Sequence, residues 1–262
     1  MDLSKMTGKE VRDIVRQEKW TSHMSGAAPG FVVCNLVVLP ESVALEFSVF
    51  AQRNPRSCPV LDITEPGNPE PTYAAPGADV RTDLSKYRVY RKGKLMEEVT
   101  NIKDLWRDDF VAFLIGGTFS FEKEMMDAGI PLRHIEEKKT CPNYITNIRS
   151  NPTRHFSGPM VVSMRPIPKE FVVRSVQISS RYPGAHGAPI HIGYPELIGI
   201  KDLSRPDFGE PVTIKKGEIP MFWPCGVTPQ TVAMEAKPEI MITHAPGHPM
   251  ITDLKLQDLA IL

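Results

Sequence analysis

The residues best suited to chemistry lie between Phe222 and Gln230, a segment that combines a thiol, a hydroxyl and a helix-starting pattern. Thr228 is a favourable helix N-cap, and Pro229 suits the first helical position. A helix start leaves backbone N–H groups unpaired and carries partial positive charge, so it can bind an anion. The segment therefore predicts an anion site with the Cys225 thiol at its mouth. The plainer alternative is a capped helix with a packed Cys.

Histidines lie on both sides of this segment. Small residues surround His186 and His191, which lets the backbone approach a ligand. His244 and His248 are four positions apart, but Pro246-Gly247 between them prevents the helix that an HExxH zinc site requires. We predict that His186, His191 or His244 transfers protons near neutral pH. A loop metal site built from these histidines stays open, and packed histidines are the blander alternative.

Three arginines that do not stand within a run of charged residues are candidates for binding a carboxylate: Arg81, Arg165 and Arg181. The planar guanidinium fork matches a carboxylate, although a loop salt bridge is the usual role of such a residue. The familiar cofactor and nucleophile motifs (GxGxxG, the Walker loop, GxSxG and CxxC) are absent from the sequence. Their absence argues against a nucleotide-driven reaction and against a serine hydrolase.

Composition is typical of a soluble globular protein. The 262 residues are 41% hydrophobic and 24% charged, and 31 basic residues balance 31 acidic ones. This balance predicts no nucleic-acid partner and no attraction to an anionic membrane. No apolar run approaches the roughly 18 residues of a membrane span, and the first residues do not form a signal peptide. Four cysteines without CxxC spacing suit a reducing compartment, so we expect a cytoplasmic protein.

Hydrophobic patterning predicts an α/β fold with α+β character, in which mixed sheets pack against helices. After an N-terminal helix and loop (1–30), strands and helices alternate through 31–158 and again through 159–262. We expect these two α/β halves to pack as one compact unit. Predicted strands are 31–39, 59–63, 133–137, 144–148, 159–164 and 189–192, with a hairpin at 87–96 and helices at 8–19, 41–52, 104–115 and 168–180.

The two halves share an ordered series of similar residues. Pro40 and Pro168 are 128 positions apart. Farther on, Gly117–Glu122 aligns with Cys225–Gln230, which places Ser120 on Thr228 and Glu122 on Gln230. The pattern predicts an internal duplication, against the alternative of chance similarity between two α/β segments. In a duplicated fold the two helix starts are expected to face one another across a pseudo-twofold axis.

Longer motifs resemble a known family, the putative hydro-lyases, whose domain also occurs in mitochondrial D-glutamate cyclase. The motifs that carry this resemblance are Ala28–Gly30, Gln52–Pro55, Ala75–Asp79, Arg81–Asp83, Trp106–Asp109, Phe119–Glu122, Arg133–Glu137, Ser163–Pro166, His186–Gly193, Cys225–Gln230 and Thr243–His248. The resemblance covers nearly the whole chain. It implies lyase chemistry on a small carboxylate substrate, with D-glutamate closing to 5-oxo-D-proline as water is lost.

Ring closure needs an unprotonated amine, an electrophilic carboxyl carbon and a proton for the departing water. We therefore predict two groups of site residues. The catalytic candidates are His186, His191, His244, Cys225 and Glu122. The substrate-binding candidates are Arg165, Arg181, Ser120, Thr228, Gln230 and Arg81. No cofactor is identified. A divalent metal and a homo-oligomer stay open, and the alternatives are a non-catalytic carboxylate-binding protein and a metal-dependent hydro-lyase.

Overall fold

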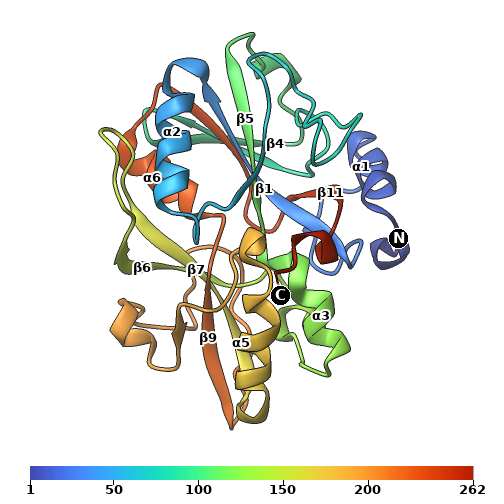
Figure 1. The fold of residues 1–262 in the computed structure, drawn as a ribbon, viewed down its shortest axis with the longest axis vertical. Coiled ribbons are helices and arrows are strands. Elements are labelled where there is room, and N and C mark those ends of the chain that lie inside the picture. The colour runs from blue at the N-terminus through green and yellow to red at the C-terminus, as the bar shows by residue number, and fades with distance from the viewer. Residues whose placement is uncertain (262) are drawn as a thin grey trace.

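Two apolar runs that are 128 positions apart form the longest strands, β1 (Phe31–Pro40) and β7 (Pro159–Pro168). The computed structural model describes residues 1–261 and builds one antiparallel sheet around each of these strands (Figure 1). β1 pairs with β5 (Phe110–Gly116), and β7 pairs with β9 (Glu218–Pro224). Most residues of β1, β5 and β7 are buried, as expected for continuous apolar strands covered on both faces.

The remaining strands extend these two central pairs. The larger sheet has the order β2-β5-β1-β10-β3-β4 with β11 also beside β1, and the smaller sheet has the order β6-β7-β9-β8. Their bounds are β2 (Val60–Ile63), β3 (Tyr87–Arg91), β4 (Lys94–Val99), β6 (Asn143–Arg149), β8 (His191–Ile192), β10 (Ile240–His244) and β11 (Met250–Lys255). Every strand pairing recorded within residues 1–261 is antiparallel. The α+β character is thus confirmed.

Within residues 1–261, six α-helices pack against the sheets: α1 (Gly8–Arg16), α2 (Glu41–Arg53), α3 (Glu122–Asp127), α4 (Arg133–Glu136), α5 (Val172–Ser180) and α6 (Thr228–Ala236). The first begins with a capping box, in which Thr7 and Glu10 bond reciprocally. Within the described part of the chain, no helix is long and apolar enough to cross a lipid bilayer.

Three local predictions are wrong. The segment 104–115 is not a helix, because Phe110–Gly116 forms the buried strand β5, and a short apolar run does not by itself distinguish a strand from a buried helix. The predicted strand 133–137 is the short helix α4, in which Arg133 and Glu136 pair one turn apart. Thr228 does not cap α6. Val227 holds the cap position instead, and the hydroxyl of Thr228 bonds back to the Cys225 carbonyl at 2.7 Å.

The two central strand pairs have the same register. Cys34 faces Gly116 and Pro40 faces Phe110 in the β1–β5 ladder. Val162 faces Pro224 and Pro168 faces Glu218 in the β7–β9 ladder. The partners on β1 and β7 differ by 128 positions, and those on β5 and β9 by 108, as the sequence alignment requires. The duplication stays a prediction, and this shared register supports it.

Each half contributes elements to the sheet of the other half (Figure 1). After β5, α3 packs with α5 in one hydrophobic core against β7 and β9, and β6 then pairs with β7. After β9, α6 packs in the core shared by α2, β1 and β5, and β10 then pairs with β1. The chain therefore crosses between the sheets twice, at Gly117-Thr118 and at Cys225-Gly226.

Candidate functional site

A cavity lies where the two chain crossings meet. It is lined by Val33, Asn35, Gly117, Thr118, Phe119, Thr140, Cys141, Asn143, Ser163, Cys225, Gly226, Val227, His244, Gly247 and Pro249. Both crossings contribute to this lining, so the segments just before the two predicted helix starts share one site. Asn35 and Ser163, one from each central strand, occupy positions 128 apart and line it together.

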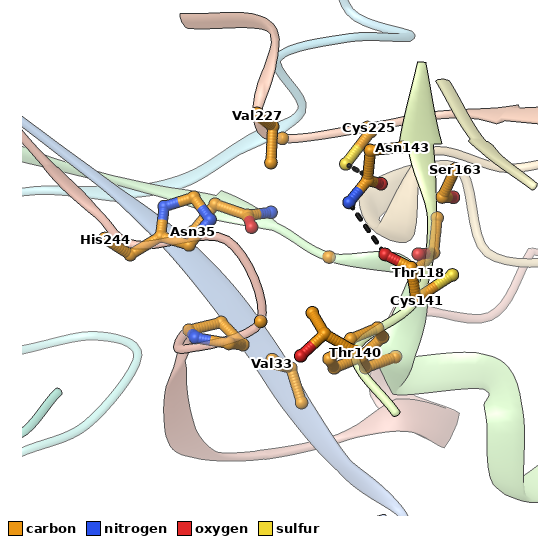
Figure 2. A pocket seen from close by; sticks show the side chains of 15 residues that line it. Val33, Asn35, Thr118, Thr140, Cys141, Asn143, Ser163, Cys225, Val227 and His244 are labelled. Atoms are coloured by element: carbon orange, nitrogen blue, oxygen red, sulfur yellow. Dashed lines mark hydrogen bonds between the residues drawn. The ribbon is translucent and has the colours of Figure 1, made fainter. Parts of the chain in front are cut away.

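The cavity is narrow and uncharged. It offers about 30 Å³ to the centre of a water-sized sphere, which is room for about two or three water molecules at roughly 10–15 Å³ each. Figure 2 shows Asn35 and His244 on one side, and Thr118, Ser163, Asn143, Cys141 and Cys225 on the other. No Asp, Glu, Lys or Arg belongs to this lining. Its polarity suits the head group of a small acid, and its walls must move apart to admit all of a five-carbon acid.

Ser120 and Thr228 were predicted to bind substrate, but both face the strands and do not line the cavity. The Ser120 hydroxyl accepts a hydrogen bond from Val33 N at 2.9 Å. The Thr228 hydroxyl accepts one from Val161 N at 3.1 Å. Both side chains are at most 1% exposed. They fasten the two crossings to β1 and β7 in the same way, so their role in this structure is to hold the cavity walls in place.

Glycine at position 226 lets the second crossing between the sheets, Cys225-Gly226, approach β1. A Cβ atom there would lie 2.0 Å from Asn35 Nδ2 and 2.8 Å from Asn35 Cβ, closer than atoms approach without displacement. The Asn35 amide itself donates to the carbonyls of Ile115 and Gly116, at 3.3 and 3.2 Å. Within the described residues, the backbone N–H groups of Gly226 and Thr118 have no acceptor, although both residues line the cavity. Each is therefore a donor available to a bound molecule.

Arg165 and Glu122 form a buried ion pair directly behind one wall. Arg165 Nη2 lies 2.5 Å from Glu122 Oε1, and both side chains are at most 3% exposed. Burial would raise the pKa of Glu122, but His134 and Arg165 outweigh this effect and hold that pKa below its usual range. His134 Nε2 also lies close to this carboxylate, 3.0 Å from Glu122 Oε1.

The guanidinium of Arg165 also contacts two cavity residues. It donates from Nη1 to Ser163 Oγ and from Nη2 to Thr118 Oγ1, each at 3.1 Å. A guanidinium only donates hydrogen bonds, so both hydroxyls act as acceptors toward it and keep their own protons for other partners. Arg165 was predicted to bind substrate, and Glu122 was predicted to be catalytic. Neither lines the cavity, and both act on it through these hydroxyls.

His244 is the histidine that lines the cavity. It is 1% exposed, and its Nδ1 atom is buried without a hydrogen-bond partner among residues 1–261. Burial lowers its pKa to about 3, so the imidazole is neutral near pH 7. The side chain of Gln230 donates to the His244 carbonyl at 2.9 Å and accepts from the Tyr90 hydroxyl at 3.0 Å. Gln230 therefore stands behind the cavity wall, where it holds His244.

Two cysteines line the cavity, and burial makes both poor thiolates. Burial raises the pKa of Cys225 to about 11 and that of Cys141 to about 12. Cys225 Sγ lies 3.2 Å from Asn143 Oδ1, to which its thiol donates (Figure 2). The Asn143 amide in turn donates to the Cys141 carbonyl at 3.0 Å. This arrangement fits the packed-thiol alternative for Cys225.

Four further predicted site residues also lie outside the cavity lining. His186 is buried against the Arg56 carbonyl at 2.8 Å, and burial lowers its pKa to about 4. His191 lies at the edge strand β8 and contacts the Tyr194 carbonyl. Arg181 is exposed at the end of α5, and Arg81 pairs with Asp79 near the N-terminal helix. The structure does not bring these four together.

The sequence prediction missed several lining residues, and two of them had a detectable signal. Asn35 and Ser163 each interrupt an apolar strand, at positions related by the 128-residue offset. A buried polar side chain in a central strand needs a partner or a role. By contrast, no pattern distinguishes Asn143 or Thr118, because the fold alone brings them to the cavity.

Metal ligands are not gathered in the described part of the chain. No group of three or more His, Cys, Asp or Glu side chains is placed to hold an ion there. The metal-dependent alternative from the sequence stays a prediction, and the effect of a chelator on turnover would test it.

Comparison with known proteins identifies the class to which this fold and cavity belong. Residues 111–253 match the family model described as D-glutamate cyclase. The chain therefore belongs to the D-glutamate cyclase family, which confirms the resemblance inferred from its motifs.

Individual relatives match along the whole chain and share one name, putative hydro-lyase. The relative from Geobacillus kaustophilus is 59% identical over 98% of each chain. Those from Bacillus licheniformis and Psychrobacter arcticus are 55% and 52% identical over 100% of each chain. A solved nitrogen repressor-like protein from Methanococcus jannaschii aligns over 90% of this chain and 91% of its own, at 10% identity with a TM-score of 0.40. A similarity that weak identifies no shared function.

Proposed function

We propose that the protein is a lyase that removes water from a small acid, and that its reaction is the closure of D-glutamate to 5-oxo-D-proline. One observation carries the proposal. Hydroxyl groups on one side of the cavity, from Thr118 and Ser163, lie opposite the imidazole of His244, whose Nδ1 atom is buried without a partner among the described residues (Figure 2). The first group suits a carboxylate or an oxyanion, and the second can carry a proton. Family membership supports the same reaction class.

The reaction needs no net charge from the protein. As the amine nitrogen bonds to the side-chain carboxyl carbon, one carbon–oxygen bond breaks and that oxygen leaves as water. The ammonium group loses two protons overall, and both leave on the departing oxygen. Protons therefore move only within the site, so a cavity without charged side chains is compatible with the chemistry. Donors that strengthen as the oxyanion forms would lower the barrier.

His244 is the proposed proton carrier between nitrogen and oxygen. With a pKa of about 3 it is a weak base, but once protonated it is a strong acid toward a departing hydroxyl group. The N–H group of Gly226, next to Asn35, supplies a further donor for the tetrahedral intermediate. Cys225 and Cys141 have no covalent role in this scheme, because both thiols stay protonated.

The test is to incubate the purified protein with D-glutamate and to measure 5-oxoproline by chromatography, with L-glutamate in parallel. We expect product from D-glutamate, and a loss of turnover of about 100-fold or more in His244→Gln, the range typical of a lost acid–base group. Arg181→Ala, an exposed change away from the cavity, is the matched control and should keep full turnover. Equal rates in wild type and His244→Gln would refute the assignment.

A non-catalytic carboxylate-binding protein is the second candidate. The pKa values of about 3 for His244 and about 11 for Cys225 leave neither group titrating near pH 7, which suits binding better than acid–base work. Tight binding of small carboxylates by calorimetry, without loss or gain of water in any acid of a panel, would favour this candidate.

A further inference from the structure

The two walls of the cavity differ in the charge behind them. Glu122 and Gln230 are aligned positions of the two halves, 108 residues apart, and each side chain stands behind one crossing. Behind the first crossing Glu122 pairs with the buried cation Arg165. Behind the second, the neutral Gln230 bonds to the carbonyl of His244. The cavity is therefore polarised, although no charge lines it.

The positive end of the buried pair points toward the cavity. Glu122 contacts Arg165 at Nε and Nη2, whereas Nη1 and Nη2 donate to Ser163 and Thr118. The two hydroxyls are thus held by the cation and have protons left to donate toward the cavity. Both are at least 95% buried, so solvent weakens this field little. An anionic group is favoured on this wall.

The opposite wall favours a neutral reacting group. His244 is uncharged, and its neighbours Asn35 and Gln230 are amides. Arg88, whose Nη1 donates to Gln230 Oε1 at 3.2 Å, has a second partner in Glu98 at 2.7 Å, which offsets its charge. This wall thus offers the neutral imidazole of His244 as a proton acceptor, without a strong electrostatic field from a nearby charge.

We propose that the cavity binds its substrate in one orientation. A carboxylate that does not react lies against Thr118 and Ser163, and the carbon that loses its oxygen lies beside His244. This assignment rests on the proposed function and makes the substrate class an acid with a second, unreactive carboxylate. Arg165 is then a positioning residue, because it acts through the two hydroxyls and does not contact the substrate.

The experiment separates binding from turnover. Thr118→Val and Ser163→Ala each remove a hydroxyl that donates to a carboxylate, so KM for D-glutamate should rise about 10- to 100-fold with little change in kcat. His244→Gln should lower kcat at least 100-fold and change KM little. Thr118→Ser, which keeps the hydroxyl, should restore KM. Urea unfolding of each variant verifies that it is folded.

An independent measurement uses glutarate, a five-carbon dicarboxylate that has no amine and cannot cyclise. Its Kd, from calorimetry, should rise about 10-fold or more in Thr118→Val and by a clearly smaller factor in His244→Gln. If the hydroxyl variants lower kcat at unchanged KM, or bind glutarate as tightly as wild type, the orientation is overturned. A different result separates the two proposals: the protein turns over no acid, yet its glutarate affinity depends on Thr118. This result would overturn the proposed function and would support the binding of a carboxylate at Thr118 and Ser163.

Discussion

The buried pair of Glu122 and Arg165 gives a quantitative prediction about stability. Arg165 is 0% exposed and Glu122 is 3% exposed, with two of the guanidinium nitrogens within 3.1 Å of one carboxylate oxygen. Removing one partner of such a pair leaves an unpaired buried charge and typically costs about 3–5 kcal/mol. Glu122→Gln keeps the shape and one acceptor, so we expect a loss near 3 kcal/mol. Arg165→Met leaves the carboxylate with His134 alone, so we expect a loss near 5 kcal/mol.

The double variant distinguishes charge from packing. Glu122→Gln combined with Arg165→Met removes both charges, so the free energy of unfolding should recover at least half of the loss of the worse single variant. Urea unfolding at pH 7, with the slope compared between variants, measures all four proteins. Two single changes that cost less than about 1 kcal/mol each, or whose costs simply add in the double variant, would refute the reasoning.

The same pair has a defined pH dependence. The folded pKa of Glu122 lies below its usual range, so the stability from its charge is present above the unfolded value of about 4.3. That stability is lost as the pH falls through the folded pKa. The difference between wild type and Glu122→Gln should therefore be largest at neutral pH and shrink below about pH 4.

Three further predictions concern the cavity. Gly226→Ala places a Cβ atom 2.0 Å from Asn35 Nδ2, so the free energy of unfolding should fall by about 1–3 kcal/mol in urea unfolding. The affinity for a carboxylate, measured by calorimetry, should fall as well. His244 has a pKa of about 3 when folded and about 6.5 when unfolded, so the unfolded state binds more protons between these pH values. The free energy of unfolding should therefore be about 2 kcal/mol lower at pH 5 than at pH 7. His244→Asn should reduce this dependence of stability on pH, measured by urea unfolding at both pH values. Burial raises the pKa of Cys225 to about 11, so iodoacetamide should label it slowly at pH 7.5 and Cys225→Ser should keep turnover within about tenfold; rapid labelling together with loss of activity would restore a role for the thiol.

The sequence was informative wherever local chemistry decides structure. The strand 31–39, the helix 41–52 and the hairpin 87–96 are each set by residues close together in the sequence, and each was predicted. The strand Phe110–Gly116 was missed because an apolar run gives the same signal for two kinds of buried element.

The site was only partly predictable, for a different reason. His244 and Cys225 were identified from their types and neighbours, and both line the cavity. Thr118 and Asn143 reach it only because the chain crosses between the sheets, and no local pattern encodes that crossing. Ser120 was assigned to substrate because it sits at a helix start, whereas its hydroxyl is used by the backbone of Val33.

The exchange of elements between the halves has a consequence for how the protein assembles. Neither half contains all the strands of its own sheet, since β6 completes the sheet of β7 and β10 lies in that of β1. A polypeptide cut in the loop near Gly158 should give two fragments that stay unfolded apart and recover structure only when mixed. Because the cavity sits where the two crossings touch, binding competence should return in step with that association, as a single cooperative event.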